Sequence, residues 1–193
     1  MSDSLNITGN ILKVMALFTE GYDRQLYIRE VCGLLPITHG TAYNILTLLE
    51  KRGILESVMR GKIRIFTLKR NNQAQHYCAL AESYKRVIFS EEFPEADGII
   101  CRINPYLFGP SALFGSYAKR SPDESSDIDI FVAGDYDRRE IMKISRIFGI
   151  RIEVKAYPVD LFTEIKRDDP LIKEVYKSHI LIKCQDFFIR EAF

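Results

Sequence analysis

Two aspartates separated by a single residue are the strongest chemical signal in this sequence of 193 residues. Asp127 and Asp129 open the segment 127–132, in which polar and apolar residues alternate as in a β-strand. Residues two apart on a strand point to one side, so both carboxylates should share a face while Ile128 and Ile130 face the core. Neighbouring carboxylates repel each other unless a cation lies between them, and Mg²⁺ prefers oxygen ligands of this kind. The spacing therefore favours a magnesium-binding pair.

Ten residues separate the pair Gly115-Ser116 from Asp127, and the pair follows a short apolar strand predicted for residues 111–114. A glycine where a strand ends lets the backbone approach a ligand closely, and N–H groups in such a turn can bind an anion. Alone, a Gly-Ser pair carries little information, and a D-x-D pair is often only solvated polarity. Together they provide what phosphoryl or nucleotidyl transfer needs, because that chemistry depends on positioning and charge neutralisation.

The combination of G-S, ten residues and D-I-D between apolar positions resembles the signature of the polymerase-β nucleotidyltransferase superfamily. The fuller form GSYA…SDIDIFV is similar to the minimal nucleotidyltransferases of bacteria and archaea, and the resemblance covers residues 94–183. It implies a small mixed-sheet domain and a metal-dependent enzyme. Such an enzyme moves a nucleoside monophosphate, expected to be AMP, from ATP or another nucleoside triphosphate to an acceptor that the sequence does not identify.

The resemblance also implies a third carboxylate on a later strand that follows a helix. A helix is predicted over residues 138–148, and in the strand after it Glu153 lies between apolar neighbours. Asp127, Asp129 and Glu153 are then the catalytic residues and the ligands of two Mg²⁺ ions, with Glu153 helping to activate the acceptor hydroxyl. The alternative is that Glu153 is an exposed acid on an edge strand.

The nucleotide phosphates are assigned, on the same resemblance, to the turn and the loop after it. The expected phosphate-binding residues are Gly115, Ser116, Lys119 and Arg120. One departure stands out, since small members of the family commonly have glycine where this sequence has Arg120. A side chain there either narrows the phosphate pocket or grips the nucleotide.

The elements before this domain form a different pattern. Helices are predicted over residues 11–18 and 28–35, and a third begins after Thr38, whose hydroxyl suits an N-cap. The third helix has a buried stripe of Ala42, Leu46 and Leu49. Two short strands follow within residues 54–68, joined by the basic tip Arg60-Gly61-Lys62.

Residues 27–68 resemble a winged helix-turn-helix, a family that places its third helix in the DNA major groove and its hairpin along the backbone. The residues expected to face the bases are His39, Tyr43, Asn44 and Thr47. Those expected to neutralise phosphates are Arg60, Lys62 and Arg64. The basic hairpin favours DNA as a partner, while a protein-protein or dimerisation module is the alternative.

These patterns predict an α+β chain with three segments. Residues 1–70 form the winged helix-turn-helix DNA-binding domain, 71–93 a connecting helix and 94–193 the minimal nucleotidyltransferase domain. The connecting helix either carries a homodimer contact or packs between the domains. Charge is distributed unevenly, because residues 1–70 contain 10 Lys and Arg against 6 Asp and Glu, whereas the remainder contains 17 against 20. This asymmetry suggests a nucleic-acid surface on the first segment, although charge alone is explained equally by a solvated charged surface.

Composition and the N-terminus indicate the compartment. Hydrophobic residues make up 47% and charged residues 27%, a balance typical of globular proteins. The sequence contains no apolar run of the ~20 residues that a membrane span needs and no signal peptide pattern. The four cysteines are widely spaced, which predicts reduced thiols rather than zinc ligands or disulfides. We therefore expect a cytoplasmic protein with no membrane partner.

Three functions fit the sequence. The first is a nucleotidyltransferase with a DNA-binding module, for which a protein acceptor is attractive because several related small domains modify a partner protein. The second is a DNA-binding transcriptional regulator whose second domain senses nucleotide without turnover. The third combines them, with the winged helix bringing the transferase to nucleic acid or repressing its own operon. Glu153 distinguishes the first two, since a sensor needs only two carboxylates and transfer needs the third.

Overall fold

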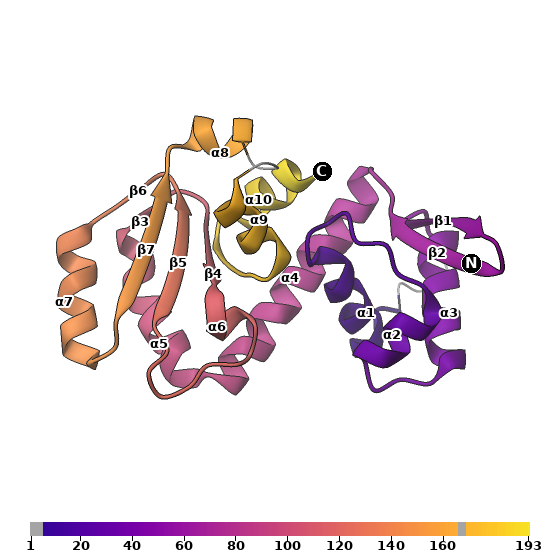
Figure 1. Cartoon of the computed structure of the whole chain (residues 1–193), viewed down its shortest axis with the longest axis horizontal. Coiled ribbons are helices and arrows are strands. Elements are labelled where there is room, and N and C mark those ends of the chain that lie inside the picture. Colours follow the sequence, from indigo (N-terminus) through magenta and orange to yellow (C-terminus); the bar gives the residue numbers. More distant parts are fainter. Residues whose placement is uncertain (1–5, 166–168) are drawn as a thin grey trace. The chain divides into compact units, whose positions relative to one another are not determined.

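The computed structural model describes residues 6–165 and 169–193 and divides the chain into two compact units. The first unit comprises Met1–Tyr84 together with Phe193, and the second comprises Lys85–Ala192. The division falls inside the long helix α4 (Asn72–Glu92), which covers the segment expected to connect the domains. Figure 1 shows both units in the colours of the sequence.

The first unit begins with three helices and ends in a hairpin before α4. Its elements are α1 (Gly9–Thr19), α2 (Ile28–Leu34), α3 (His39–Lys51), β1 (Leu55–Arg60) and β2 (Ile63–Leu68). As expected from the sequence, Thr38 caps α3, because its hydroxyl accepts a hydrogen bond from the Thr41 N–H at 3.2 Å. The antiparallel hairpin is extended by Leu26, which exchanges backbone hydrogen bonds with Phe66.

Apolar periodicity explains the packing of this unit. The predicted stripe of α3 is fully buried, and Ile45 joins it with 7% exposure. The residues buried beside it come from α1 and from the hairpin: Val14, Met15, Phe18, Leu55, Phe66 and Leu68. The opposite side of α3 is left to solvent, as an amphipathic helix requires.

The second unit contains the chemistry-bearing segments. It begins with α5 (Pro94–Ile103), the 3₁₀ turn Asn104–Tyr106, β3 (Leu107–Phe108), β4 (Ser111–Phe114), α6 (Gly115–Ala118) and β5 (Ile128–Ala133). It continues with β6 (Asp135–Tyr136), α7 (Arg138–Phe148), β7 (Ile152–Tyr157), α8 (Val159–Ile165), α9 (Pro170–Lys177), β8 (Ile180–Lys183) and α10 (Gln185–Ala192). Strands β3 and β6 pair separately from the main sheet.

The main sheet is mixed and has the strand order β7-β5-β4-β8. Strand β5 is antiparallel to β4 and parallel to β7, and β4 is antiparallel to β8. A parallel pair needs a crossover, which α7 supplies between β5 and β7. Helix α7 begins at Asp137, whose carboxylate accepts the N–H of Arg139 and of Glu140, and it ends at Gly149 with φ of +66°. Both ends follow helix-capping rules.

The two faces of β5 have different roles. Ile128, Ile130 and Val132 lie in a buried core with apolar residues of α5 and α7. On the other face Phe131 contacts Phe162 and Phe188, with ring centroids 5.4 and 6.5 Å away. These aromatic residues, from α8 and α10, cover the second half of β5. The face on which Asp129 lies is therefore closed beside Phe131 and only partly closed around Asp129.

Within residues 6–165 and 169–193, no helix combines the length and apolar character of a membrane span. All four cysteines are free, as the sequence predicts: Cys32, Cys78, Cys101 and Cys184.

Candidate active site

Strand register brings together two of the predicted acids. Asp129 on β5 and Glu153 on β7 are direct partners in the parallel ladder, so their side chains lie on one face. Asp127 precedes β5 by one residue and is half-buried. Burial raises the pKa of Asp129, and the charges of Glu153 and Asp127 raise it further. The three acids predicted from the sequence therefore share one electrostatic environment.

Basic side chains balance this negative charge. Arg151 lies 3.4 Å from Asp127, and Lys155 donates a hydrogen bond to Glu153. The hydrogen bond and the charge of Lys155 lower the pKa of Glu153, so this acid is ionised at neutral pH. Glu153 and Lys155 share a face of β7, and Arg151 directly precedes that strand.

The carboxylates of this site are suitable ligands for Mg²⁺, but their positions do not form a coordination shell. Carboxylate oxygens are the ligands that Mg²⁺ prefers, and a cation would relieve the repulsion that raises the pKa of Asp129. Among the residues that the structure describes, no three His, Cys, Asp or Glu side chains are arranged to hold a metal ion. Glu153 is turned toward Lys155, so joining Asp129 on a cation requires Glu153 to exchange this partner.

Gly115 is required by a contact with Asp129. Its φ of +72° is in the left-handed region, and a Cβ atom built on it would lie 2.0 Å from Oδ2 of Asp129. The register explains this contact, because Phe114 at the end of β4 pairs with Asp129 on β5. The sequence predicts that the glycine lets a ligand approach the backbone, and the structure shows the Asp129 carboxylate making that approach. Ser116 follows, half-buried, in α6.

Both predicted phosphate-binding cations have carboxylate partners. Lys119 Nζ is 2.7 Å from Oε1 of Glu174, and the guanidinium of Arg120 is 3.3 Å from Glu92. Arg120 also has φ of +56°, a conformation that costs an ordinary residue roughly 1–2 kcal/mol. That backbone conformation is a physical reason for glycine at this position in the small domains that the sequence resembles.

Glu174 is a member of the site that the sequence analysis missed. It belongs to α9, and its charge also contributes to the raised pKa of Asp129. The helix is anchored by the buried Ile172 and Val175, which places Glu174 on its half-buried side. An acid in the sequence PLIKEVYK has no feature that separates it from the solvated acids of any amphipathic helix. The contact between Glu174 and Lys119 becomes apparent only from the packing of α9 in the folded chain.

The candidate DNA-binding side of α3 is largely exposed. His39, Tyr43 and Asn44 face solvent, and Tyr43 is 47% exposed. Thr47 differs from the expectation, because it is half-buried and its Oγ1 is inaccessible to solvent. Thr47 lies one turn beyond Tyr43 and Asn44, and neighbouring residues cover its hydroxyl. Of the four residues predicted to face the bases, the exposed ones are therefore His39, Tyr43 and Asn44.

The hairpin presents two of its three predicted cations to solvent. Arg60 and Lys62 lie exposed at the tip, on either side of Gly61. Arg64 differs, because it donates a hydrogen bond to Ser57 at 2.9 Å and forms an ion pair with Glu50. Its charge is thus already neutralised by α3, and the hairpin cations open to an anion are Arg60 and Lys62.

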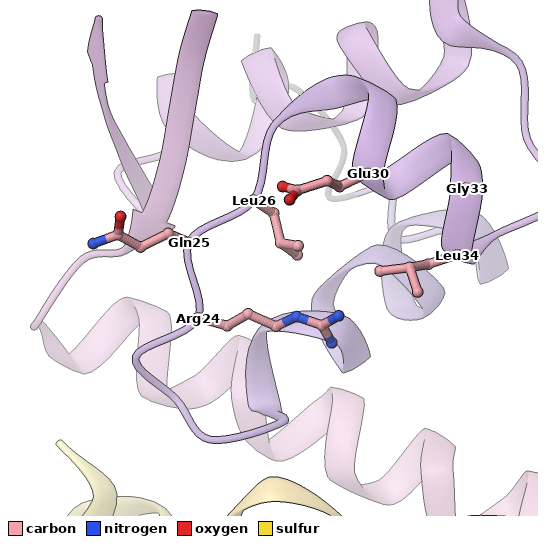
Figure 2. A pocket seen from close by; sticks show the side chains of 6 residues that line it. All are labelled: Arg24, Gln25, Leu26, Glu30, Gly33 and Leu34. Atoms are coloured by element: carbon pink, nitrogen blue, oxygen red, sulfur yellow. The ribbon is translucent and has the colours of Figure 1, made fainter. Parts of the chain in front are cut away.

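An open pocket of about 390 Å³ lies in the first unit (Figure 2). It is lined by residues of α2 and of the loop before it: Arg24, Gln25, Leu26, Glu30, Gly33 and Leu34. Arg24 forms an ion pair with Glu20. None of the residues predicted to bind DNA or nucleotide lines this pocket, so we assign it no part in the site.

A family model matches part of the second unit. Residues 111–188 match the family described as Polymerase beta, Nucleotidyltransferase. This segment contains β4, the Gly115 turn, both aspartates, Glu153 and Glu174. The chain is therefore an α+β protein with a polymerase-β-type nucleotidyltransferase domain in its C-terminal part, as the sequence predicts.

Similar solved structures add no argument about function. One is AF1382 from Archaeoglobus fulgidus, with 18% identity and a TM-score of 0.34, covering 44% of this chain and 88% of that protein. Another is TrmBL2, described as an archaeal chromatin protein with a novel mode of DNA binding, with 13% identity and a TM-score of 0.30. That likeness covers 86% of this chain and 71% of TrmBL2. No curated protein matches the sequence.

Proposed function

We propose that the second unit is a Mg²⁺-dependent nucleotidyltransferase that transfers a nucleoside monophosphate, AMP in the first instance, to a hydroxyl-bearing acceptor. The register that pairs Asp129 with Glu153 is the observation that carries this proposal. In this register Glu153 lies beside Asp129, on the face of β5 that Phe131, Phe162 and Phe188 leave partly open. A protein that only binds a metal-nucleotide complex needs fewer carboxylates than one that transfers a nucleotidyl group, so the third carboxylate favours transfer.

Asp127, Asp129 and Glu153 are the proposed ligands of two Mg²⁺ ions. Such ions, when bound, neutralise phosphate charge and stabilise the attacking and leaving oxygens. Glu153 is ionised at neutral pH and lies on an edge strand, so it is placed to accept a hydrogen bond from the acceptor hydroxyl. The acceptor hydroxyl passes its proton to Glu153 as its oxygen forms a bond to the α-phosphorus, the bond from that phosphorus to the bridging oxygen breaks, and pyrophosphate leaves.

The β- and γ-phosphates are assigned to the turn at Gly115 and Ser116 and to Lys119 and Arg120. The ion pairs of Lys119 and Arg120 are solvent-exposed, with side-chain exposures of 49% and 46% for the two cations. Pairs of this kind are weak, and each cation has further N–H donors, so phosphate oxygens can reach both side chains. The proposed phosphate site is thus charged and reachable.

Transfer is tested by incubating the protein with labelled ATP or other labelled nucleotides and Mg²⁺, alone and with cell extract. The control is the Asp127→Ala/Asp129→Ala double variant. We expect label on an acceptor only with the unaltered protein. Binding of nucleotide without transfer under every condition would contradict the proposal.

A nucleotide sensor is the second candidate for this unit. It is favoured by the engagement of Glu153 with Lys155, because a sensor does not need Glu153 as a metal ligand. The variant Glu153→Gln separates the two functions. An enzyme loses transfer while retaining most of its nucleotide affinity, whereas a sensor shows no transfer before or after the change.

For the first unit we propose a winged helix-turn-helix that binds DNA. The order of three helices and a hairpin, the exposed face of α3 and the exposed cations Arg60 and Lys62 support this assignment. A mobility-shift titration with duplex DNA at increasing salt tests it. We expect affinity to fall steeply with salt, since phosphate contacts release counterions. Affinity that does not change with salt would contradict the proposal.

A further inference from the structure

Glu174 and Lys119 form an ion pair that joins α9 to the end of α6, 55 positions apart in the sequence. Nζ of Lys119 donates a hydrogen bond to Oε1 of Glu174 over 2.7 Å. The two side chains are 49% and 44% exposed, so solvent and ligands reach both groups. The geometry is that of a well-formed charged hydrogen bond in an open position.

Both partners are fixed by the backbone around them. The N–H of Lys119 donates to the carbonyl of Gly115 at 3.1 Å, and Gly115 is the residue against which Asp129 lies. On the other side, Asp169 caps α9 by accepting the N–H of Ile172 at 3.0 Å.

Asp169 also joins α9 to the strand that carries Glu153. Its Oδ2 accepts a hydrogen bond from the hydroxyl of Tyr157, at the end of β7, over 3.1 Å. Burial and Asp169 both raise the pKa of Tyr157, so the phenol remains protonated and donates. The charge of Glu174 reaches Asp129, whose pKa it helps to raise. Asp169 thus joins α9 to β7, the strand that carries Glu153, while Glu174 affects Asp129 of β5 through its charge.

The chemistry of the lysine ammonium explains what the pair can do. An ammonium has three N–H donors, of which Glu174 occupies one. The remaining donors are open to phosphate oxygens, while the pairing limits the rotation of a long flexible side chain. An anchored lysine loses less conformational freedom when it binds a phosphate than a free one does.

We propose that Glu174 is a positioning residue that holds Lys119 ready for the triphosphate, which makes α9 part of the nucleotide site. This inference rests on the nucleotidyltransferase function proposed above. It predicts that Glu174 acts through Lys119, so the effects of changing the two residues are not additive.

The test is a double-mutant cycle on nucleotide affinity. Binding of a non-hydrolysable ATP analogue with Mg²⁺ is measured by calorimetry for the unaltered protein, Glu174→Gln, Lys119→Met and the double variant. We expect each single change to weaken binding by about 3- to 10-fold, a coupling typical of residues in contact. The double variant should bind no more weakly than Lys119→Met alone.

The matched control is Glu140→Gln. Glu140 pairs with Lys143 on the exposed side of α7 over 3.4 Å, and we expect unchanged nucleotide affinity when it is replaced. Melting temperatures of all variants verify folding. If Glu174→Gln unfolds, Glu174→Asp, which keeps the charge on a shorter side chain, should weaken binding by a smaller factor than Lys119→Met.

Three outcomes would overturn the inference. Unchanged or tighter binding by Glu174→Gln, with normal binding by the unaltered protein, would show that Glu174 does not position Lys119 and would leave the proposed function standing. If Glu174→Gln weakened nucleotide binding by the same factor in the Lys119→Met variant as in the unaltered protein, Glu174 would act independently of Lys119. No binding by the unaltered protein would overturn both this inference and the proposed function.

Discussion

At the scale of single residues, the contact between Gly115 and Asp129 connects backbone geometry to chemistry. The Asp129 carboxylate occupies the space that a side chain at position 115 would need. Its position is set by this contact and by the pairing of Asp129 with Glu153. A side chain at position 115 therefore displaces a proposed metal ligand as well as straining the turn.

We predict that Gly115→Ala abolishes Mg²⁺-dependent nucleotide binding and destabilises the fold by more than the strain of its φ alone. Gly149→Ala is the matched control, because Gly149 has φ of +66° and open space around it. That control should cost about 1 kcal/mol or slightly more and leave nucleotide binding intact. Denaturant unfolding and calorimetry measure both effects. Equal losses in the two variants would contradict the role assigned to the contact.

Asp129 itself should oppose folding at neutral pH when no metal is present. Its pKa is raised by burial and by Glu153 and Asp127, so the folded protein holds this proton more tightly than the unfolded chain. The residue therefore favours folding below its ordinary pKa and loses that contribution as pH rises through the raised value.

Because ionised Asp129 opposes folding, we predict that Asp129→Asn raises the melting temperature at pH 7 in the presence of a metal chelator. The gain should shrink toward zero as pH falls below about 4, where the carboxyl is protonated in both states. Thermal unfolding of both proteins between about pH 3 and pH 8 measures the difference. A gain that does not change with pH would show that ionisation of Asp129, opposed by burial and by the neighbouring carboxylates, is not its cause.

At the scale of elements, the candidate site depends on helices and strands that the sequence predicts to different degrees. Strands β4, β5 and β7 and helix α7 lie where apolar patterns and the D-x-D motif predict them. The acid on β7 is predicted through the family resemblance, and strand register then places it beside Asp129. Glu174 was not predictable, because a helix sequence does not specify which strand the helix covers.

Side-chain partners are the other part that the sequence leaves open. Arg64 and Thr47 have the residue types of DNA contacts, yet Arg64 pairs with Glu50 and the Thr47 hydroxyl is buried. Arg120 has the residue type of a phosphate ligand, yet its φ of +56° is a backbone property that the sequence does not display. Composition and spacing assign residues to a surface, whereas packing decides which of them are accessible.

We predict that the cap of α9 affects nucleotide binding. Asp169→Ala removes the acceptor for the Ile172 N–H and for the Tyr157 hydroxyl, which should cost about 1–2 kcal/mol of folding stability. It should also weaken nucleotide binding, because Glu174 lies on the helix that loosens. Asp137→Ala is the matched control, since it removes the cap of α7 at a similar cost in stability. Weaker nucleotide binding by both variants to the same extent would point to general destabilisation.

At the scale of the whole molecule, the two units carry opposite charge and separate proposed ligands. The exposed cations of the hairpin belong to the first unit, and the carboxylate cluster belongs to the second. DNA binding and nucleotide binding should therefore respond to different substitutions.

We predict that Arg60→Glu/Lys62→Glu abolishes DNA binding at moderate salt and leaves nucleotide affinity unchanged within about 2-fold, because substitutions that share no partner are usually independent. Arg64→Gln should affect DNA binding less than either charge reversal, since its charge is already paired with Glu50. Mobility shifts and calorimetry on the same preparations measure the two activities. Loss of DNA binding only in Arg64→Gln would contradict the assignment of the hairpin surface.

The central claim is that the second unit performs nucleotidyl transfer, and the position of the label in ATP tests it most directly. The protein is incubated with Mg²⁺, cell extract and ATP labelled either at the α-phosphate or at the γ-phosphate. Transfer of α-label to an acceptor, with the γ-label released in pyrophosphate, is the predicted result. Transfer of γ-label, or ATP binding with no transfer of either label, would contradict the claim.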